Sequence, residues 1–370
     1  MRATIDRDVF PGGACVSVSR GDLREIHCSR RSAPGRELDV FRSFPGVPGT
    51  PVAQWVFGGC RYHDEAVELL GDVSWPLTWV HGDGCSGENL AGTQVMALRG
   101  VEPHVLRLDG RPVGTWYEDG LARYAYLGGV LPADLSRSRP EQARSVFERL
   151  EGVLESAGFS FTDIVRTWLF LEDLLDWYDD FNPVRTRFFE ERGVFDTMIP
   201  ASTGIGAANP AGAALVAGAV AVRPLCEDVR IFPVASPLQC PATEYRSSFS
   251  RAAEVRAGGL RTLYVSGTAS IAPGGESQFE GDIDRQIRRT MEVIEAILES
   301  RRMEWADVSR MVVYMKDMHD APRFHEYCRR RGFPSVPYCF AHAAVCRDDL
   351  LFEVEADAVA ADGQNDLSGR

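Results

Sequence analysis

The sequence has almost no lysine, and it lacks any long apolar run. Lys316 is the single lysine among 40 Lys and Arg residues, and the net charge is −13. Nucleic-acid binders need a basic face, so this acidic balance argues against that class. No stretch approaches eighteen uninterrupted apolar residues, and residues 1–6 lack the apolar run of a signal peptide. With 370 residues, of which 45% are apolar and 25% charged, the composition predicts a globular protein of two or three domains, without a membrane span.

Cofactor and metal motifs are also missing. The nine cysteines are scattered, and none forms a C-x-x-C pair. An odd number at irregular spacing predicts no disulfide framework and a reducing, cytoplasmic compartment. The seven histidines show no zinc-ligand spacing, and neither a G-x-G-x-x-G, a P-loop nor a G-x-S-x-G motif occurs in the expected context. We therefore expect an enzyme that uses no metal or cofactor, or a binding protein.

An internal repeat organises the chain. Residues separated by 144 positions match in both polar identity and apolar character, which is hard to obtain by chance. The matched pairs include Glu155 with Glu299, Asp163 with Asp307, Arg166 with Arg310, Asp173 with Asp317, Leu150 with Ile294, and Leu154 with Leu298.

Each copy predicts a β-α-β-α-β unit of the α/β (α+β) class, with its helices covering one sheet face. The elements are a strand ending in glycine (124–128 or 263–267), an amphipathic helix (143–154 or 283–298), a β-rich segment (164–171 or 308–315), a second helix after Asp173 or Asp317, and an apolar strand (213–222 or 351–359). We divide the chain into a degenerate N-terminal α/β domain (1–110), copy one (111–232), copy two (233–362) and a disordered tail (363–370).

Copy two has carboxylates on its final apolar strand. Glu353 and Glu355 lie two residues apart, so they share one face of a strand. The equivalent strand of copy one, residues 212–222, contains no acid. Burial would raise the carboxyl pKa and make such a residue a general acid near neutrality. The alternative is a solvated strand face.

Cys346 lies just before this strand and can be read in two ways. A buried cysteine is usually a small hydrophobic residue. His342 invites a Cys–His dyad, but no orienting acid or oxyanion motif accompanies the pair. We therefore interpret His342 as a packed side chain.

Two polar segments could bind anions. Residues 200–206 combine the hydroxyls of Ser202 and Thr203 with Gly204, and residues 245–251 contain Tyr245, Arg246 and Arg251. Glycine-flanked amides form anion-binding nests, and arginine forks bind carboxylates. An ordinary polar turn and a solvated loop are the alternatives. In the stretch 172–189 we interpret the aromatic residues as helix core and the pair at 179–180 as a solvated face.

The repeat unit resembles the YjgF/Rid family of small α/β proteins, which form trimers with ligand sites at subunit interfaces. The likeness is strongest at residues 250–252, 264–267 and 352–356 of copy two. It implies tandem YjgF/Rid-like units in a pseudo-trimer-like core, and a functional role for Glu353. Tyr338 stands where the family's carboxylate-binding arginine would fall, which argues against simple imine deamination.

Most of the chain is similar to the chorismatases, relatives built on the same fold. The resembling stretches are residues 75–80, 88–95, 166–189, 200–210, 236–243, 247–252 and 266–269. The resemblance implies that chorismate loses its enolpyruvyl group as pyruvate, without metal or cofactor, after a glutamate protonates the methylene. Glu353 fits that glutamate. Cys346, seven residues earlier, resembles the subtype that makes 3-hydroxybenzoate, whereas the hydrolytic subtype has alanine there.

These inferences define one predicted site, between copy two and a neighbouring unit, with Glu353 and Cys346 as its catalytic residues. Chorismate is the expected small-molecule partner, and we expect a monomer that binds neither nucleic acid nor membranes. Three alternatives stay open: a hydrolytic chorismatase that yields a dihydroxycyclohexadiene carboxylate, an imine deaminase, and a non-enzymatic ligand-binding protein. A role in secondary metabolism rests on family analogy. The expected substrate-binding residues are Tyr245, Arg246, Arg251, Ser202, Thr203, Gly204, Gly267, Ala269 and Tyr338.

Overall fold

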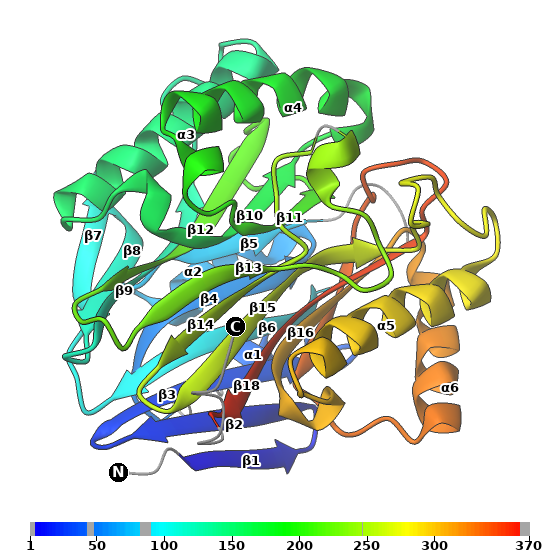
Figure 1. Ribbon diagram of the computed structural model, residues 1–370, viewed down its shortest axis with the longest axis horizontal. Coiled ribbons are helices and arrows are strands. Elements are labelled where there is room, and N and C mark those ends of the chain that lie inside the picture. The colour runs from blue at the N-terminus through cyan, green and yellow to red at the C-terminus, as the bar shows by residue number, and fades with distance from the viewer. Residues whose placement is uncertain (1–3, 43–47, 82–89, 246, 363–370) are drawn as a thin grey trace.

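The computed structural model describes residues 4–42, 48–81, 90–245 and 247–362, and it contains three six-stranded sheets (Figure 1). The first sheet has the order β1-β2-β3-β6-β4-β5. The helices described in this unit are short. Its elements are β1 (Thr4–Phe10), β2 (Gly13–Arg20), β3 (Leu23–Arg31), α1 (Asp39–Arg42), β4 (Thr50–Gly58), the 3₁₀ turn η2 (Cys60–Tyr62), α2 (His63–Leu70), β5 (Leu77–Val80) and β6 (Leu90–Arg99).

The middle sheet has the order β7-β8-β9-β12-β10-β11, and two long helices cover its outer face. Its elements are β7 (His104–Leu108), β8 (Arg111–Glu118), β9 (Ala122–Val130), α3 (Arg139–Ser156), η3 (Phe161–Asp163), β10 (Ile164–Leu171), α4 (Leu174–Glu191), η4 (Val194–Asp196), β11 (Ala201–Gly206) and β12 (Leu215–Pro224).

The third sheet has the order β13-β14-β15-β18-β16-β17, and α5 and α6 cover it. Its elements are β13 (Arg230–Val234), η5 (Ala242–Tyr245), β14 (Ala252–Ala257), β15 (Leu260–Ala269), α5 (Ile283–Ser300), η6 (Trp305–Asp307), β16 (Val308–Met315), η7 (Met318–Asp320), α6 (Ala321–Arg331), β17 (Tyr338–His342) and β18 (Phe352–Ala361).

All three sheets share one strand order: a three-stranded meander, then the sixth strand, the fourth and the fifth. The fourth and fifth strands are parallel in each sheet, and a helix connects them. The N-terminal part is therefore a third unit of the same topology with shortened helices. The fold class predicted from sequence, tandem units around a pseudo-trimer-like core, is confirmed.

The predicted β-α-β-α-β order of each copy was incomplete. It omitted the first two strands of each meander and β17 of copy two, and it interpreted residues 200–206 as a loop, whereas Ala201–Gly206 form β11. Apart from Ile205, β11 consists of small or polar residues, and nearly all of it is buried, so no apolar-polar alternation marks it as a strand.

The strand pairing favours domain limits that differ from those we proposed from the sequence. β7 pairs with β8 in the middle sheet, and β13 pairs with β14 in the third. We therefore propose boundaries just before β7 and β13, rather than after residues 110 and 232. The tail, residues 363–370, lies outside the described residues.

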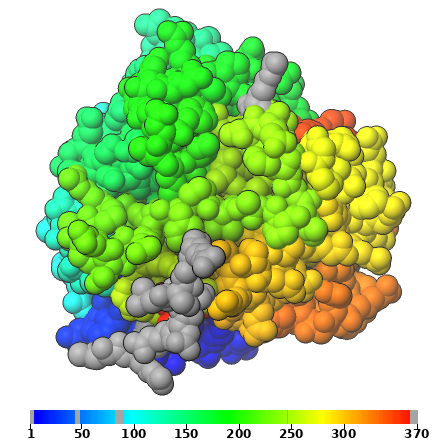
Figure 2. Space-filling model, viewed as in Figure 1, coloured from blue at the N-terminus to red at the C-terminus, as the bar shows by residue number. Residues whose placement is uncertain are grey.

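The inner faces of the sheets meet in one core, while the long helices lie outside (Figure 1). Side chains from all three sheets pack there, including Trp55, Tyr126, Trp168, Tyr264 and Tyr314. On the face shown in Figure 2, the middle unit in green adjoins the third unit in yellow and orange. This arrangement places strands of different units against one another, which is where a site between units can form.

Helix boundaries follow the local sequence signals. Ser138 and Glu141 form a capping box at the start of α3, where Pro140 fits the first turn. The apolar stripe predicted for α3 is buried, as is the stripe from Ile283 to Leu298 in α5. Both predicted helices are confirmed.

One disulfide was not anticipated. Cys15 and Cys28 are register partners on β2 and β3, and they are bonded to each other. Residues thirteen apart meet here because a hairpin joins the two strands, a pairing that cysteine spacing alone does not reveal. No helix within the described ranges is long and apolar enough to cross a membrane.

Candidate active site between the middle and third units

A cavity of about 220 Å³ lies between the middle and third units. Its volume is below the roughly 300–1,000 Å³ of pockets for drug-sized ligands, so it suits a smaller molecule. Helix α4 and strand β11 contribute residues from the middle unit, while β15, β18 and two loops contribute from the third. The lining residues are Tyr178, Asp179, Asn182, Arg185, Ser202, Gly204, Tyr245, Ser247, Phe249, Arg251, Gly267, Ala269, Ile271, Cys346, Arg347 and Glu353.

The cavity contains a buried carboxyl group, that of Glu353. Glu353 lies on β18 opposite Ala269 and is 4% exposed. Burial, followed by the charge of Glu355, raises the pKa of Glu353 to about 8, although Arg166 and Arg251 oppose this shift. The side chain is therefore mostly protonated at pH 7 and can donate a proton.

Gly267 provides the space that the Glu353 carboxyl occupies. A Cβ atom built on Gly267 would meet Oε1 of Glu353 and would crowd the Thr203 methyl at 3.2 Å. Any larger residue would displace the carboxyl group, so the glycine fixes where the acid can lie.

Glu355, two residues further along β18, has the opposite ionisation. Its carboxylate is fully buried and binds Arg166 Nη2 at 2.8 Å, Arg310 Nη1 at 2.7 Å and Trp168 Nε1 at 2.9 Å. Burial alone would raise the pKa of Glu355, but the two guanidinium groups outweigh burial and lower it. Two neighbouring carboxyl groups with opposite protonation states are typical of acid–base active sites.

Arginines give the cavity a positive wall. Arg251 is buried, and its guanidinium lies over the Tyr245 ring. Its Nε and Nη2 donate hydrogen bonds to the Cys240 carbonyl, at 2.9 and 2.8 Å. Arg185 is also buried and donates to Asn182 Oδ1 at 2.8 Å. Such fixed guanidinium groups suit an anionic ligand.

Cys346 lines the same cavity as a neutral thiol. Burial, followed by the charge of Glu353, raises the pKa of Cys346 to about 12. Since the thiolate is the nucleophilic form, the pKa argues against covalent catalysis by this cysteine. His342 instead contacts the Lys316 carbonyl at 3.1 Å and does not line the cavity.

The structure brings most of the predicted site residues together. Eight line the cavity: Ser202, Gly204, Tyr245, Arg251, Gly267, Ala269, Cys346 and Glu353. Thr203 points away from the cavity, because neighbouring residues of β11 face opposite sides, and it is fully buried. Arg246 lies outside the described residues.

Tyr338 is not part of this cavity, contrary to its predicted place in the site. It lies on β17, where its hydroxyl contacts His325 at 3.0 Å and Arg31 lies over its ring. β17 of the third unit faces the first unit, just as β11 of the middle unit faces the third. The residue at this position therefore serves the neighbouring interface.

Helix α4 contributes residues to the cavity that the sequence patterns did not indicate. Tyr178, Asp179, Asn182 and Arg185 line the cavity, although we interpreted the aromatic residues of this stretch as helix core and residues 179–180 as a solvated face. Trp177 and Phe181 do pack in the core as predicted. A signal was available: Arg185 follows Phe181 by four positions, which places an arginine on the buried stripe of an amphipathic helix.

The strand register shows why only one of the three interfaces carries this acid. Glu353 on β18 pairs with Tyr314, and the matching positions are Val216 on β12, opposite Phe170, and Gly92 on β6, opposite Phe57. Neither replacement can donate a proton. Within the described residues, no cluster of three or more His, Cys, Asp or Glu side chains could hold a metal ion.

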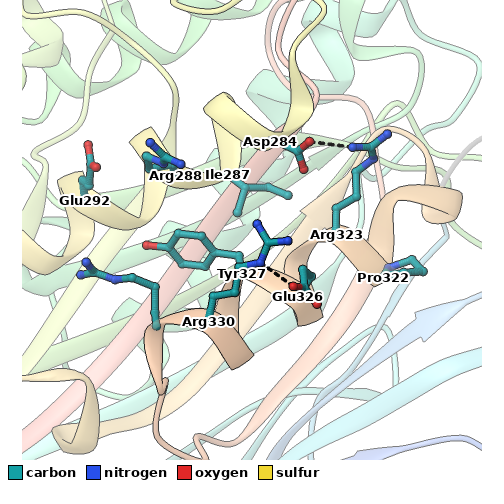
Figure 3. A pocket seen from close by; sticks show the side chains of 10 residues that line it. Asp284, Ile287, Arg288, Glu292, Pro322, Arg323, Glu326, Tyr327 and Arg330 are labelled. Atoms are coloured by element: carbon teal, nitrogen blue, oxygen red, sulfur yellow. Dashed lines mark hydrogen bonds and ion pairs between the residues drawn. The ribbon is translucent and has the colours of Figure 1, made fainter.

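A larger groove of about 760 Å³ runs between α5 and α6 (Figure 3). Its walls carry charged side chains that pair with one another, as Asp284 does with Arg323 at 2.6 Å and Glu326 with Arg330. Ile287 and Tyr327 form its apolar part. It has no buried carboxyl group, so we assign the chemistry to the smaller cavity.

Fold and site together define an α+β protein of three fused units with a ligand cavity at a unit interface. The chain belongs to the endoribonuclease L-PSP family, also called YjgF/Rid, whose family model matches residues 115–220 and 242–360. These two stretches fall in the middle and third units. The resemblance predicted from sequence is thereby confirmed.

Individual relatives match different shares of the chain. A 3-hydroxybenzoate synthase of Streptomyces hygroscopicus is 28% identical over 272 residues, which cover 65% of this chain and 75% of that protein. A chorismatase of the same organism is 25% identical over 271 residues, 66% and 76% of the two chains. A RutC family protein of Pyrococcus horikoshii is 33% identical over 97 residues, 26% of this chain and 77% of that protein.

Among solved structures, a chorismatase crystal structure matches with a TM-score of 0.65 and 21% identity. The match covers 90% of this chain and 98% of the other. At this identity the likeness supports the fold, three units included.

Proposed function

We propose that this chain is a chorismatase, which cleaves chorismate and releases pyruvate. The observation that carries the proposal is the buried carboxyl of Glu353, whose pKa burial raises to about 8, in a cavity that arginines also line. The relatives named 3-hydroxybenzoate synthase and chorismatase support it.

Glu353 is the proposed proton donor. Its proton passes to the methylene carbon of the enolpyruvyl ether, and the electron pair of the double bond forms the new C–H bond. Positive charge then develops on the ether carbon, where an oxygen nucleophile adds before pyruvate leaves. Protonating carbon needs a neutral acid near its target, so a pKa raised to about 8 fits the step.

The arginine wall is the proposed binding site for the two carboxylates of chorismate. Arg251 and Arg185 are buried and each donates to a neutral partner, and neither forms an ion pair with a carboxylate of the described residues. Tyr245 and Ser247 add polar groups beside them. Bidentate arginine contacts would fix the methylene relative to Glu353.

Cys346 supports 3-hydroxybenzoate as the product. As a neutral thiol it can occupy the space where a water molecule would attack, leaving a ring hydroxyl as the nucleophile. The hydrolytic reaction, which gives a dihydroxycyclohexadiene carboxylate, is the alternative. Imine deamination is a weaker alternative, because Ser202 rather than an arginine stands at the position of β11 that matches Tyr338 of β17.

The test is chromatography of products after incubation with chorismate, without added metal or cofactor. We expect pyruvate and 3-hydroxybenzoate from the wild type and a rate at least about 100-fold lower from Glu353→Gln. Cys346→Ala should divert product toward the dihydroxydiene acid.

Each alternative gives a different result. If the wild type forms the dihydroxydiene acid, the proposed product is wrong but chorismate cleavage stands. If Glu353→Gln keeps full activity, the proposed acid is wrong. If chorismate is not consumed, the proposed function fails and imine substrates come next.

A further inference from the structure

Arg166 connects the three strands that form the cavity walls. Its guanidinium is fully buried and donates to Glu355 on β18 at 2.8 Å, to the Val265 carbonyl on β15 at 2.9 Å, and to Thr203 Oγ1 on β11 at 2.8 Å. The same strands carry Glu353, Gly267 and Ser202 into the cavity. One side chain of the middle unit thus sets the spacing between strands of two units.

Thr203 extends this connection to the acid. Its hydroxyl accepts from Arg166 and from the Gly267 amide at 3.1 Å, and it hydrogen-bonds to Glu355. Gly267 in turn borders the Glu353 carboxyl, and a Cβ there would collide with it. A continuous chain of contacts therefore runs from Arg166 through Thr203 and Gly267 to the proton donor.

We propose that Arg166, acting through the Thr203 hydroxyl, is a positioning residue that holds Glu353 at the geometry required for proton transfer. The proposal rests on the proposed function of Glu353 as the acid. Arg166 itself would touch neither the substrate nor the reacting atoms. Because proton transfer to carbon is sensitive to position, loosening this chain should slow the chemical step more than it weakens binding.

The repeat offers a matched control at the interface of the first and middle units. Thr78 on β5 pairs with Trp55 just as Thr203 on β11 pairs with Trp168. Its hydroxyl accepts the Gly129 amide at 2.9 Å, the counterpart of the Gly267 contact. Ala53 follows the bulge of β4 just as Arg166 follows the bulge of β10, so Ala53 is the counterpart of Arg166. Thr78 therefore packs at its interface in the same way as Thr203, but without an arginine partner from this position.

The experiment compares Thr203→Val, Thr203→Ser and Thr78→Val in steady-state assays with chorismate. Valine keeps the shape of threonine and removes the hydroxyl, while serine keeps the hydroxyl. We expect Thr203→Val to lower kcat about 10- to 100-fold with KM changed less than about threefold. Thr203→Ser should restore most of kcat, and Thr78→Val should retain it.

A second readout is independent of turnover. In unliganded protein labelled with ¹³C-glutamate, the Glu353 carboxyl resonance should shift in Thr203→Val and stay in place in Thr78→Val. If wild-type protein does not turn over chorismate, the proposed function fails, and this resonance still tests the positioning chain.

Two results would overturn the proposal. Equal losses of kcat in Thr203→Val and Thr78→Val would mean that both hydroxyls serve stability alone. An unchanged Glu353 resonance in Thr203→Val would mean that the contact chain does not reach the acid. Arg166→Lys, which keeps the charge but cannot span three strands, should reduce kcat at least as much as Thr203→Val, provided that it folds.

Discussion

Two glutamates on one strand face show how strongly local partners control ionisation. Glu353 and Glu355 are both buried, yet the pKa of the first rises to about 8 while the pKa of the second falls. Glu355 has Arg166 and Arg310 in direct contact, whereas Glu353 faces the cavity without a salt bridge in the described residues. The ion pairs keep Glu355 charged, and the charge of Glu355 adds to burial in raising the pKa of Glu353.

Protonation of Glu353 has a consequence for stability that does not depend on substrate. Below about pH 4.5 the carboxyl is protonated in folded and unfolded chains, so it contributes nothing to pH dependence. Between that pH and about 8 only the unfolded chain ionises, so the wild type loses stability as pH rises. Glu353→Gln cannot ionise, and its thermal midpoint should exceed the wild-type value by a margin that grows from pH 5 to pH 8. A margin that is equal at both pH values would contradict the raised pKa.

At the scale of elements, α4 combines packing with binding. Its buried stripe contains Trp177, Phe181 and Phe188, but Arg185 interrupts it. The partners of Arg185 among the described side chains, Asn182 and Tyr178, are neutral, and burial lowers its pKa. The helix therefore holds a charge in its packed face, and we propose that this charge serves ligand binding rather than stability.

Replacing Arg185 should separate stability from binding. Arg185→Met removes a buried, unpaired charge and keeps most of the volume, so we expect a higher thermal midpoint. The same change should raise KM for chorismate about tenfold or more, since a hydrogen bond to a charged group is lost. Arg187→Met, at an exposed position of the same helix, is the control and should change neither quantity markedly. Lower stability together with unchanged KM would contradict the assigned role.

β11 is the element that sequence patterns described least well. The sequence singled out its residues Ser202 and Gly204 as part of an anion-binding segment, and both line the cavity, but the segment was interpreted as a loop. A short parallel strand between two units has no solvent face, so hydrophobic alternation cannot identify it. Its place in the sheet depends on β10, which lies more than thirty residues earlier.

At the scale of the whole molecule, three units of equal strand order surround one core, as subunits of a trimer would. Their equivalent positions have diverged: Glu353 has Val216 and Gly92 as counterparts. Fusion into one chain permits such divergence, because each interface is encoded separately.

This asymmetry predicts one ligand per chain and a monomeric protein. Calorimetric titration with a non-cleavable chorismate analogue should give a stoichiometry near one, and sedimentation should give a mass near 40.8 kDa. Glu353→Gln keeps Arg251 and Arg185 in the cavity, so it should still bind one analogue. Three binding sites, or a trimer in solution, would contradict this prediction.

The sequence by itself determined the repeat, the two long amphipathic helices and the carboxylates on the last strand. These features depend on residues near one another in the chain, where periodicity and spacing carry the information. Tertiary structure alone decided that the first unit has the same strand order as the others and that Cys15 is bonded to Cys28. It also decided that Arg185 and Glu353 line the same cavity. It also decided that Thr203 lies behind the cavity and Tyr338 at another interface. Those outcomes depend on contacts between strands and helices far apart in the chain, which fix the side of a strand that faces a cavity and the neighbour across it.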